Sequence, residues 1–261
     1  IKIYGKDAKL GHEQNLLTAP LSIERDSQFS AIAPHITSNV EQIYFAGGEP
    51  LLTSEHYQVL DKLIDIKHTD LRLTYNTNLS KLTYKNINVI DYWNQFSNVT
   101  VGASIDASDA VAEYVRHGTI WTDIVENIRI IKKYAPNVNL TITSTVSFLT
   151  IENLIKLQTK WLDEKLFNVV DLTLNVLISP NNLSPAALPM HHKQRLRNII
   201  LKHIDILGET KVAKQWQDVL LYMMNNNYTH TLSDFVQRTR VLDNHRNESF
   251  VDVFPEFKDL I

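Results

Sequence analysis

Apolar residues recur along most of the chain with two alternating spacings. Stretches with a 3.6-residue spacing predict amphipathic helices, and shorter runs rich in β-branched and aromatic residues predict strands. The predicted helices are 24–38, 54–66, 86–96, 120–134 and 151–165, and the predicted strands are 42–46, 70–75, 98–105, 138–147 and 169–178. Because a helix separates each strand from the next, we expect parallel strands joined by right-handed crossovers, and therefore an α/β fold.

The two ends of the chain depart from this alternation. Residues 1–22 contain only a weak extended piece, IKIY, so the helix at 24–38 has no obvious preceding strand. A βα series would therefore have its first strand upstream of Ile1. After Pro180, a turn-rich segment leads to predicted helices at 190–207, 209–225 and 231–240. We therefore expect an α/β domain truncated at its N-terminus over residues 1–185 and a helical extension over residues 186–261.

Composition excludes several classes of function. The chain has 261 residues, 44% of them apolar, and a formal net charge of −3, which is ordinary for a globular protein and gives no basic footprint for nucleic acid. No apolar stretch approaches the roughly 20 residues that cross a bilayer, and the start lacks the apolar core of a signal peptide, so we expect a cytoplasmic protein. Cysteine is absent, which excludes disulfides, thiolate catalysis and Cys-ligated metal centres within these residues.

The segment QIYFAGGEPLL places two glycines, an acid and a proline directly after a predicted strand. Gly47 and Gly48 can adopt positive φ and allow another molecule to approach the backbone. Glu49, followed by Pro50, puts a carboxylate at the carboxyl end of the strand, where α/β sheets hold ligands, and a carboxylate there suits a cation such as an ammonium group. The alternative is a tight turn in which Glu49 is solvated and Ser54 caps the next helix.

Polar side chains also follow the other predicted strands. The strand at 70–75 leads into YNTN, the strand at 98–105 into SIDAS, and the strand at 138–147 ends among threonines and serines. The candidate residues in these segments are Asn76, Thr77, Asn78, Ser104, Asp106, Thr143, Thr145 and Ser147. Because parallel strands end at one edge of their sheet, these residues are candidates for a ligand site there.

The ordered motifs GGEP, YNTN and SIDAS, about 30 residues apart, resemble those of the radical S-adenosylmethionine (SAM) superfamily over Ile36 to Pro180. The tail VLDNHRNESFVDVFPEF resembles a short extension of the twitch type. The resemblance implies a partial (β/α)6 TIM-like barrel of parallel strands with its first strand missing here. It also implies that the Gly47–Pro50 loop, including Glu49, grips the amino group of SAM, so that replacing Glu49 with alanine weakens SAM binding and hardly changes folding.

By the same resemblance, Ser104 and Asp106 meet the ribose hydroxyls or the methionyl carboxylate, and Arg116 pairs with that carboxylate. Asn76 and Asn78 join the SAM-binding set, and Val176 with Leu177 could flank the adenine. Each has a structural alternative. Ser104 and Asp106 could cap a loop, Arg116 could be a surface residue, the asparagines could form a turn, and the apolar pair could be core.

The resemblance implies an enzyme that uses a [4Fe-4S] cluster and an external electron donor to make a 5′-deoxyadenosyl radical, which abstracts hydrogen from a small-molecule or peptide substrate. The family holds its cluster on a C-x3-C-x2-C motif that this chain lacks, so the ligands are expected upstream. Catalytic residues are not identifiable. One alternative is a cluster-less, non-catalytic module that binds SAM or protein. Another is an unrelated barrel enzyme with Glu49 and Asp106 as acid and base.

His191 and His192 are the remaining candidates for metal chemistry. Adjacent residues project about 100° apart on a helix, and no further ligand follows four residues later. The sequence therefore predicts a helix start here and no metal site.

Overall fold

The computed structural model describes residues 1–5 and 25–261, which form two compact units. The first unit comprises Ile1–Ser104 and Thr122–Thr141, and the second comprises Ile105–Trp121 and Ile142–Ile261. The division predicted between residues 185 and 186 stays a prediction.

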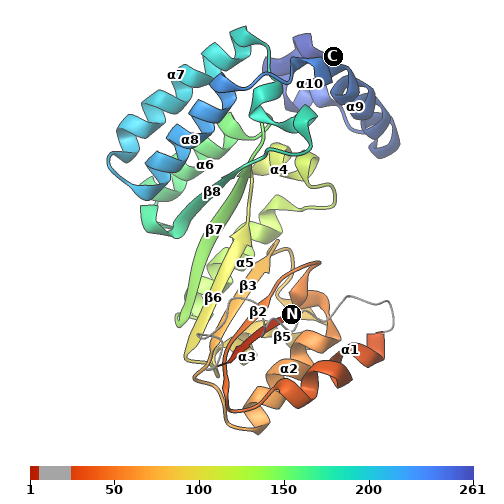
Figure 1. The fold of residues 1–261 in the computed structure, drawn as a ribbon, viewed down its shortest axis with the longest axis vertical. Coiled ribbons are helices and arrows are strands. Elements are labelled where there is room, and N and C mark those ends of the chain that lie inside the picture. Colours follow the sequence, from red (N-terminus) through yellow and green to blue (C-terminus); the bar gives the residue numbers. More distant parts are fainter. Residues whose placement is uncertain (6–24) are drawn as a thin grey trace. The chain divides into compact units, whose positions relative to one another are not determined.

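The main sheet of the first unit has the strand order β1-β2-β3-β6, and Figure 1 shows β2, β3 and β6 side by side. Their bounds are Lys2–Gly5 (β1), Val40–Phe45 (β2), Arg72–Thr77 (β3) and Asn98–Ser104 (β6). Strand β2 pairs in parallel with β3, with Tyr44 opposite Thr74, and β3 pairs in parallel with β6. Strand β1, the weak extended piece of the sequence, instead pairs antiparallel with β2.

Helices α1 (Arg25–Ile32), α2 (Ser54–Asp65) and α3 (Val89–Trp93), with most of α5 (Trp121–Tyr134), complete the first unit. Helix α2 buries Tyr57, Val59, Leu60 and Leu63, whose spacing gives it one apolar face. The unit's largest fully buried side chains are Phe45, Tyr75, Trp93, Ile43, Leu51 and Leu60. Strands β2 and β3 and helix α3 therefore supply the aromatic side chains of this core, Phe45, Tyr75 and Trp93.

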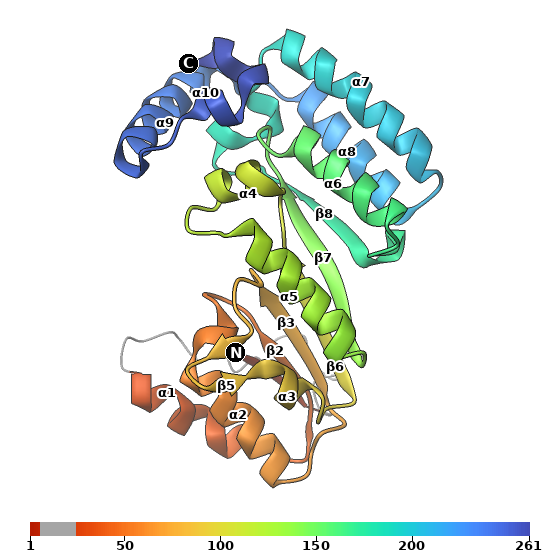
Figure 2. The ribbon, with the colours of Figure 1, turned by 180° about the vertical axis from the view of Figure 1, so that it is seen from behind.

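The second unit is built on β7 (Val138–Val146), which begins in the first unit, and β8 (Leu172–Val176). These strands pair in parallel, with Ile142 opposite Leu172. Figure 2 shows α7 and α8 as neighbours beside β8. The helices of this unit are α4 (Asp109–Val115), α6 (Ile151–Asp163), α7 (Met190–Leu207), α8 (Lys211–Asn225), α9 (Leu232–Arg246) and α10 (Phe250–Val253).

The predicted fold class is confirmed: helices alternate with most of the strands, β2, β3 and β6 are parallel to one another in the first unit, and β7 and β8 are parallel in the second, whereas only β1 among the strands of this sheet in the described residues runs antiparallel to its partner. No helix in the described part of the chain is both long and apolar enough to span a membrane.

Several predicted boundaries were wrong. The helix predicted at 24–38 ends at Ile32 and gives way to a 3-10 turn at Ala33–His35, because Pro34 lacks the N–H that would continue the helix. The helix predicted at 86–96 is only α3, since a hairpin of β4 (Thr83–Tyr84) and β5 (Ile87–Asn88) precedes it. The sequence also missed α4, the last six residues of α9, and the 3-10 helix Pro255–Leu260.

Candidate functional site

The loop after β2 has an open backbone. Gly47 and Gly48 both have positive φ, +89° and +56°, a conformation that L side chains rarely adopt. A Cβ placed on either glycine would have no heavy atom within 4 Å. Among the described residues, no hydrogen bond joins the backbone of either glycine to another group. The loop therefore offers peptide groups to an incoming molecule and uses glycine for conformation and not for close packing.

Glu49 fixes this loop to the end of β3. Its Oε1 accepts a hydrogen bond from the Thr77 hydroxyl at 2.6 Å and one from the Leu51 N–H at 3.3 Å, and its Oε2 accepts one from the Asn78 N–H at 2.8 Å. Pro50, which is buried, follows as the first residue of the 3-10 helix Pro50–Leu52. The alternative of a solvated turn glutamate is therefore wrong.

This arrangement changes what Glu49 can do. A carboxylate has about four lone-pair positions, and three of them are used by donors of the chain itself. One lone-pair position, on Oε2, remains available to accept a hydrogen bond from a ligand. The carboxylate also keeps its negative charge. These contacts argue against the expectation that removing Glu49 hardly changes folding, because its loss would leave the Thr77 O–H and the Asn78 N–H without their acceptor.

The residues at the end of β3 and just after it mainly make hydrogen bonds within the protein, to Glu49 and within their own turn. Asn78 folds back on itself, its Oδ1 accepting from the Ser80 N–H at 2.9 Å, which is an Asx-turn. Asn76 donates from Nδ2 to the Tyr44 hydroxyl at 2.7 Å and is exposed. Thr77 is buried and makes the link to Glu49, a role that the sequence did not assign to it.

An aromatic cluster lies under the same strand ends. The rings of Phe45 and Tyr75 stack with centroids 4.8 Å apart, and the His56 ring meets Phe45 edge-on at 4.8 Å. His56 Nε2 lies 3.1 Å from the Tyr75 hydroxyl oxygen, while its Nδ1 is buried with no hydrogen-bond partner among the described residues. Burial lowers the pKa of His56 to about 3, so this imidazole is neutral in the folded protein. The strand ends that carry the loop are therefore packed on a buried aromatic cluster that has no charge.

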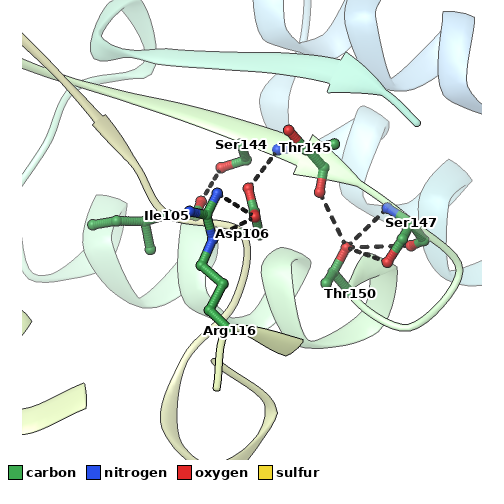
Figure 3. Close-up of polar contacts among 7 residues, drawn as sticks. All are labelled: Ile105, Asp106, Arg116, Ser144, Thr145, Ser147 and Thr150. Carbon is green, nitrogen blue, oxygen red and sulfur yellow. Dashed lines mark hydrogen bonds and ion pairs between the residues drawn. The ribbon is translucent and has the colours of Figure 1, made fainter. Parts of the chain in front are cut away.

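The second unit holds Asp106 and Arg116, which pair with each other (Figure 3). Arg116 donates from Nε at 2.9 Å and from Nη2 at 2.8 Å to Oδ2 of Asp106. The other oxygen, Oδ1, accepts from the Thr145 N–H at 2.7 Å. The Asp106 side chain is 13% exposed and that of Arg116 is 39% exposed. Arg116 is therefore not a free surface arginine, although three of its five N–H groups lie outside these two bonds.

Hydroxyl groups fix the backbone around this ion pair (Figure 3). Ser144 donates to the carbonyl of Ile105, and Thr150 bonds to the residues that end β7, accepting from the Ser147 N–H at 3.1 Å. Thr145 and Ser147 were predicted from the sequence as candidates for a ligand site at the end of their strand. Thr145 contributes through its backbone N–H, which no sequence pattern identifies.

The remaining candidates take simpler positions. Ser104 is the last residue of β6 and is partly exposed, and its hydroxyl has no hydrogen-bond partner among the described residues. Val176 and Leu177 are half-buried, and the Leu177 N–H donates to the Val146 carbonyl at 3.0 Å. These two positions continue the β7–β8 pairing. A role beside an adenine stays a prediction.

His191 and His192 do have a third possible ligand nearby. Asp259, from the 3-10 helix Pro255–Leu260, lies between them, with 3.0 Å from its Oδ2 to His191 Nε2 and 3.0 Å from its Oδ1 to His192 Nε2. A ligand spacing of four residues along one helix does not predict Asp259, because Asp259 lies 67 positions beyond His192 in the sequence.

No model of a known protein family matches the sequence, and no curated protein matches it. Among solved structures, native anSMEcpe with bound AdoMet and Cp18Cys peptide is similar, with a TM-score of 0.50 and 14% identity over 70% of this chain and 53% of that chain. Streptococcus suis SuiB bound to S-adenosylmethionine has a TM-score of 0.46 and 14% identity over 71% of this chain and 40% of its own.

The chain thus spans about half the length of the first of these proteins. At 14% identity the likeness concerns the fold alone. The fold implied by the sequence resemblance is confirmed, and this chain has the α/β architecture of a protein that has been solved with AdoMet bound.

Proposed function

We propose that this chain binds S-adenosylmethionine and that the Gly47-Gly48 loop receives its methionyl ammonium group. The observation that carries the proposal is the open backbone of two successive positive-φ glycines, whose peptide groups are not used within the described chain. An ammonium group has three N–H donors and needs acceptors arranged around it. Carbonyl groups of the loop supply such acceptors, and charge-assisted bonds of this kind are strong.

Glu49 acts on this site in two ways under the proposal. Its three hydrogen bonds hold the loop in one conformation, which reduces the ordering cost of binding. Its negative charge and the remaining acceptor position on Oε2 favour a cation at the loop. Glu49 is therefore mainly a positioning residue here.

Ser104, Asp106 and Arg116 keep their proposed roles toward the ribose and the methionyl carboxylate. The unpartnered Ser104 hydroxyl is able to accept or donate. Arg116 retains N–H groups beyond its pair with Asp106, and Asp106 orients that guanidinium. Asn76 and Asn78 stay proposed members of the set, although Asn78 already closes its own turn.

The wider proposal is a radical SAM enzyme that acts with an external electron donor. In such an enzyme one electron from a reduced [4Fe-4S] cluster would cleave SAM to methionine and a 5′-deoxyadenosyl radical. The residues of this chain do not fit such a cluster, because none of the 261 is cysteine, so its ligands would come from outside these residues. The similar protein solved with a bound peptide supports a peptide as substrate, with a small molecule as the alternative.

Calorimetric titration of SAM into the parent protein and two alanine variants tests the binding site. Gly48→Ala and Gly208→Ala both place a Cβ at positive φ, +56° and +63°, with open space around it. Each should therefore destabilise the protein by roughly 1–3 kcal/mol, with the larger loss at Gly208, whose ψ of −146° is a conformation that suits glycine alone. Only Gly48→Ala should weaken SAM binding, by roughly tenfold, because its methyl group occupies the space offered to the ligand.

Equal SAM affinity in the two variants, or no binding to the parent, would refute the loop as the site. Catalysis is tested separately, on full-length protein reconstituted anaerobically with iron and sulfide. Release of 5′-deoxyadenosine on reduction with SAM supports the enzyme. SAM binding without iron incorporation or nucleoside release supports the non-catalytic module.

A further inference from the structure

Two histidines and an aspartate that lie apart from the proposed SAM loop come together at the start of α7. His191 and His192 are the second and third residues of this helix, and Asp259 comes from the end of the chain. The three side chains each offer one ligand atom, and these atoms all lie within 4.8 Å of one another. We propose that His191, His192 and Asp259 form a binding site for a first-row divalent transition-metal ion, with Zn²⁺ as the expected occupant.

The distances suit a metal ion with little rearrangement. Nε2 of His192 lies 3.0 Å from both oxygens of Asp259, and Nε2 of His191 lies 3.0 Å from Oδ2. Two ligands of a tetrahedral ion with bonds of about 2.0 Å are separated by about 3.3 Å. The two nitrogen–oxygen pairs therefore already stand close to ligand–ligand separation, and the two histidine nitrogens, at most 4.8 Å apart, would move toward each other when the ion binds. The ion would replace the two N–H protons that now bond to the carboxylate.

The neighbouring residues hold two of the ligands in place. His192 has only 6% of its side chain exposed, and its ring packs edge-on against Phe257 with centroids 5.1 Å apart. Phe257 is buried, also contacts Phe148, and lies two residues before Asp259. Anchoring Phe257 therefore positions Asp259. Metal sites depend on such support of their ligands by surrounding groups.

The proposed site is open to solvent on the side of His191 and Asp259. The side chains of His191 and Asp259 are 64% and 49% exposed, so an ion can enter and water can complete its coordination. Two cations follow on the same helix: Arg195 pairs with Oε2 of Glu152, and the buried Lys193 donates from Nζ to the Asn226 carbonyl. Two imidazoles and one carboxylate suit Zn²⁺ and its first-row neighbours better than Mg²⁺ or Ca²⁺, which prefer oxygen ligands.

Such an ion would join the beginning of α7 to the C-terminal segment Pro255–Leu260. His191 and His192 lie 68 and 67 residues before Asp259 in the sequence, so a bound ion would close a long loop. Closing a long loop with a metal restricts the unfolded chain and stabilises the folded one. We therefore expect Zn²⁺ to raise the Tm of the protein. This expectation does not depend on SAM binding.

Calorimetry with ZnCl₂ on chelator-treated protein tests the site, with Co²⁺ absorption in the visible range as a second readout. The parent should bind one Zn²⁺ and show cobalt bands. His191→Ala and Asp259→Asn should each weaken Zn²⁺ binding at least tenfold, because the first removes one of three ligands and the second replaces the anionic ligand with a neutral amide. His191 and Asp259 are exposed, so both variants should fold, whereas His192→Ala would disturb the core.

Two variants of exposed residues in the same unit serve as matched controls. His230→Ala and Asp252→Asn remove the same chemical groups away from the cluster and should leave Zn²⁺ affinity, the cobalt spectrum and the Zn²⁺-dependent rise in Tm unchanged. The proposal is overturned if the parent binds no Zn²⁺, or if His191→Ala and Asp259→Asn bind it as the controls do. In either case the three residues form a hydrogen-bonded cluster only.

Discussion

The Glu49 carboxylate accepts a hydrogen bond from the hydroxyl of Thr77 across 2.6 Å, which joins the loop after β2 to the last residue of β3. The two residues are 28 positions apart in the sequence. Thr77 is buried, so its hydroxyl has no ready substitute from water. Holding the Gly47-Gly48 loop is therefore a structural task of Glu49, whatever binds there.

Replacing Glu49 with alanine should lower the free energy of unfolding by about 2 kcal/mol, because the Thr77 O–H and the Asn78 N–H lose their acceptor, although the Thr77 oxygen still accepts from the Leu79 N–H. Urea denaturation followed by circular dichroism measures the change. Glu41→Ala, which removes an exposed glutamate from β2, should change stability by less than about 0.5 kcal/mol. In a double-mutant cycle, Thr77→Val and Glu49→Ala should be non-additive, and additive effects would contradict the direct bond.

Asp106→Ala should destabilise the protein more than Arg116→Ala. Removing Asp106 unpairs the Thr145 N–H as well as Arg116, which predicts a loss of roughly 1–3 kcal/mol. Arg116 is 39% exposed, so its contribution is screened by solvent and should be about 1 kcal/mol or less. Thermal unfolding of both variants beside Glu126→Ala, from an exposed ion pair, gives the comparison. An equal loss for Asp106→Ala and Arg116→Ala would show that the Thr145 bond contributes nothing.

His56 should make the protein acid-sensitive. An unfolded histidine has a pKa of about 6.5, whereas burial lowers that of His56 to about 3. Below pH 6.5 the unfolded chain therefore takes up a proton that the folded chain refuses. The contribution of His56 to the free energy of unfolding is therefore fully present above pH 6.5. Between pH 6 and pH 4 this residue should lower the free energy of unfolding by about 1.4 kcal/mol per pH unit.

His56→Phe removes that titration while keeping an aromatic ring beside Phe45, so the pH dependence of unfolding should become shallower by about one proton. Urea midpoints measured from pH 7 to pH 4 provide the test. His230→Gln, at an exposed position, should leave the slope unchanged. A His56→Phe slope equal to that of the parent would mean that His56 takes up its proton in the folded state.

Gln158 should be essential to the core of the second unit. Its Oε1 accepts from Trp216 Nε1 at 2.9 Å and lies 3.1 Å from His203 Nε2, and all three side chains are buried. Gln158→Leu keeps the volume but leaves both ring nitrogens without an acceptor, which should lower the free energy of unfolding by roughly 2–4 kcal/mol. Gln237→Leu on the exposed side of α9 should change it by less than about 0.5 kcal/mol. A near-neutral Gln158→Leu would show that water already serves these groups.

Local sequence signals predicted the elements that depend on local chemistry. Strand β2, the positive-φ glycines after it and helix α2 follow from β-branched residues, from glycine and from a 3.6-residue apolar spacing. Errors arose where a single residue overrides the pattern. Pro34 ended α1 early, and the short hairpin β4–β5 was hidden in a segment with helical spacing.

The site shows the same division. The sequence by itself determined that Glu49 and Asp106 stand at strand ends, because strand order and side-chain chemistry are written locally. Only the tertiary structure decided their partners, since Thr77 reaches Glu49, Thr145 reaches Asp106 and Asp259 reaches the histidine pair. The residues in these contacts are 28 to 68 positions apart in the sequence. The contacts form only when the strands are in register and the 3-10 helix Pro255–Leu260 is packed in place, and no short stretch of sequence encodes either condition.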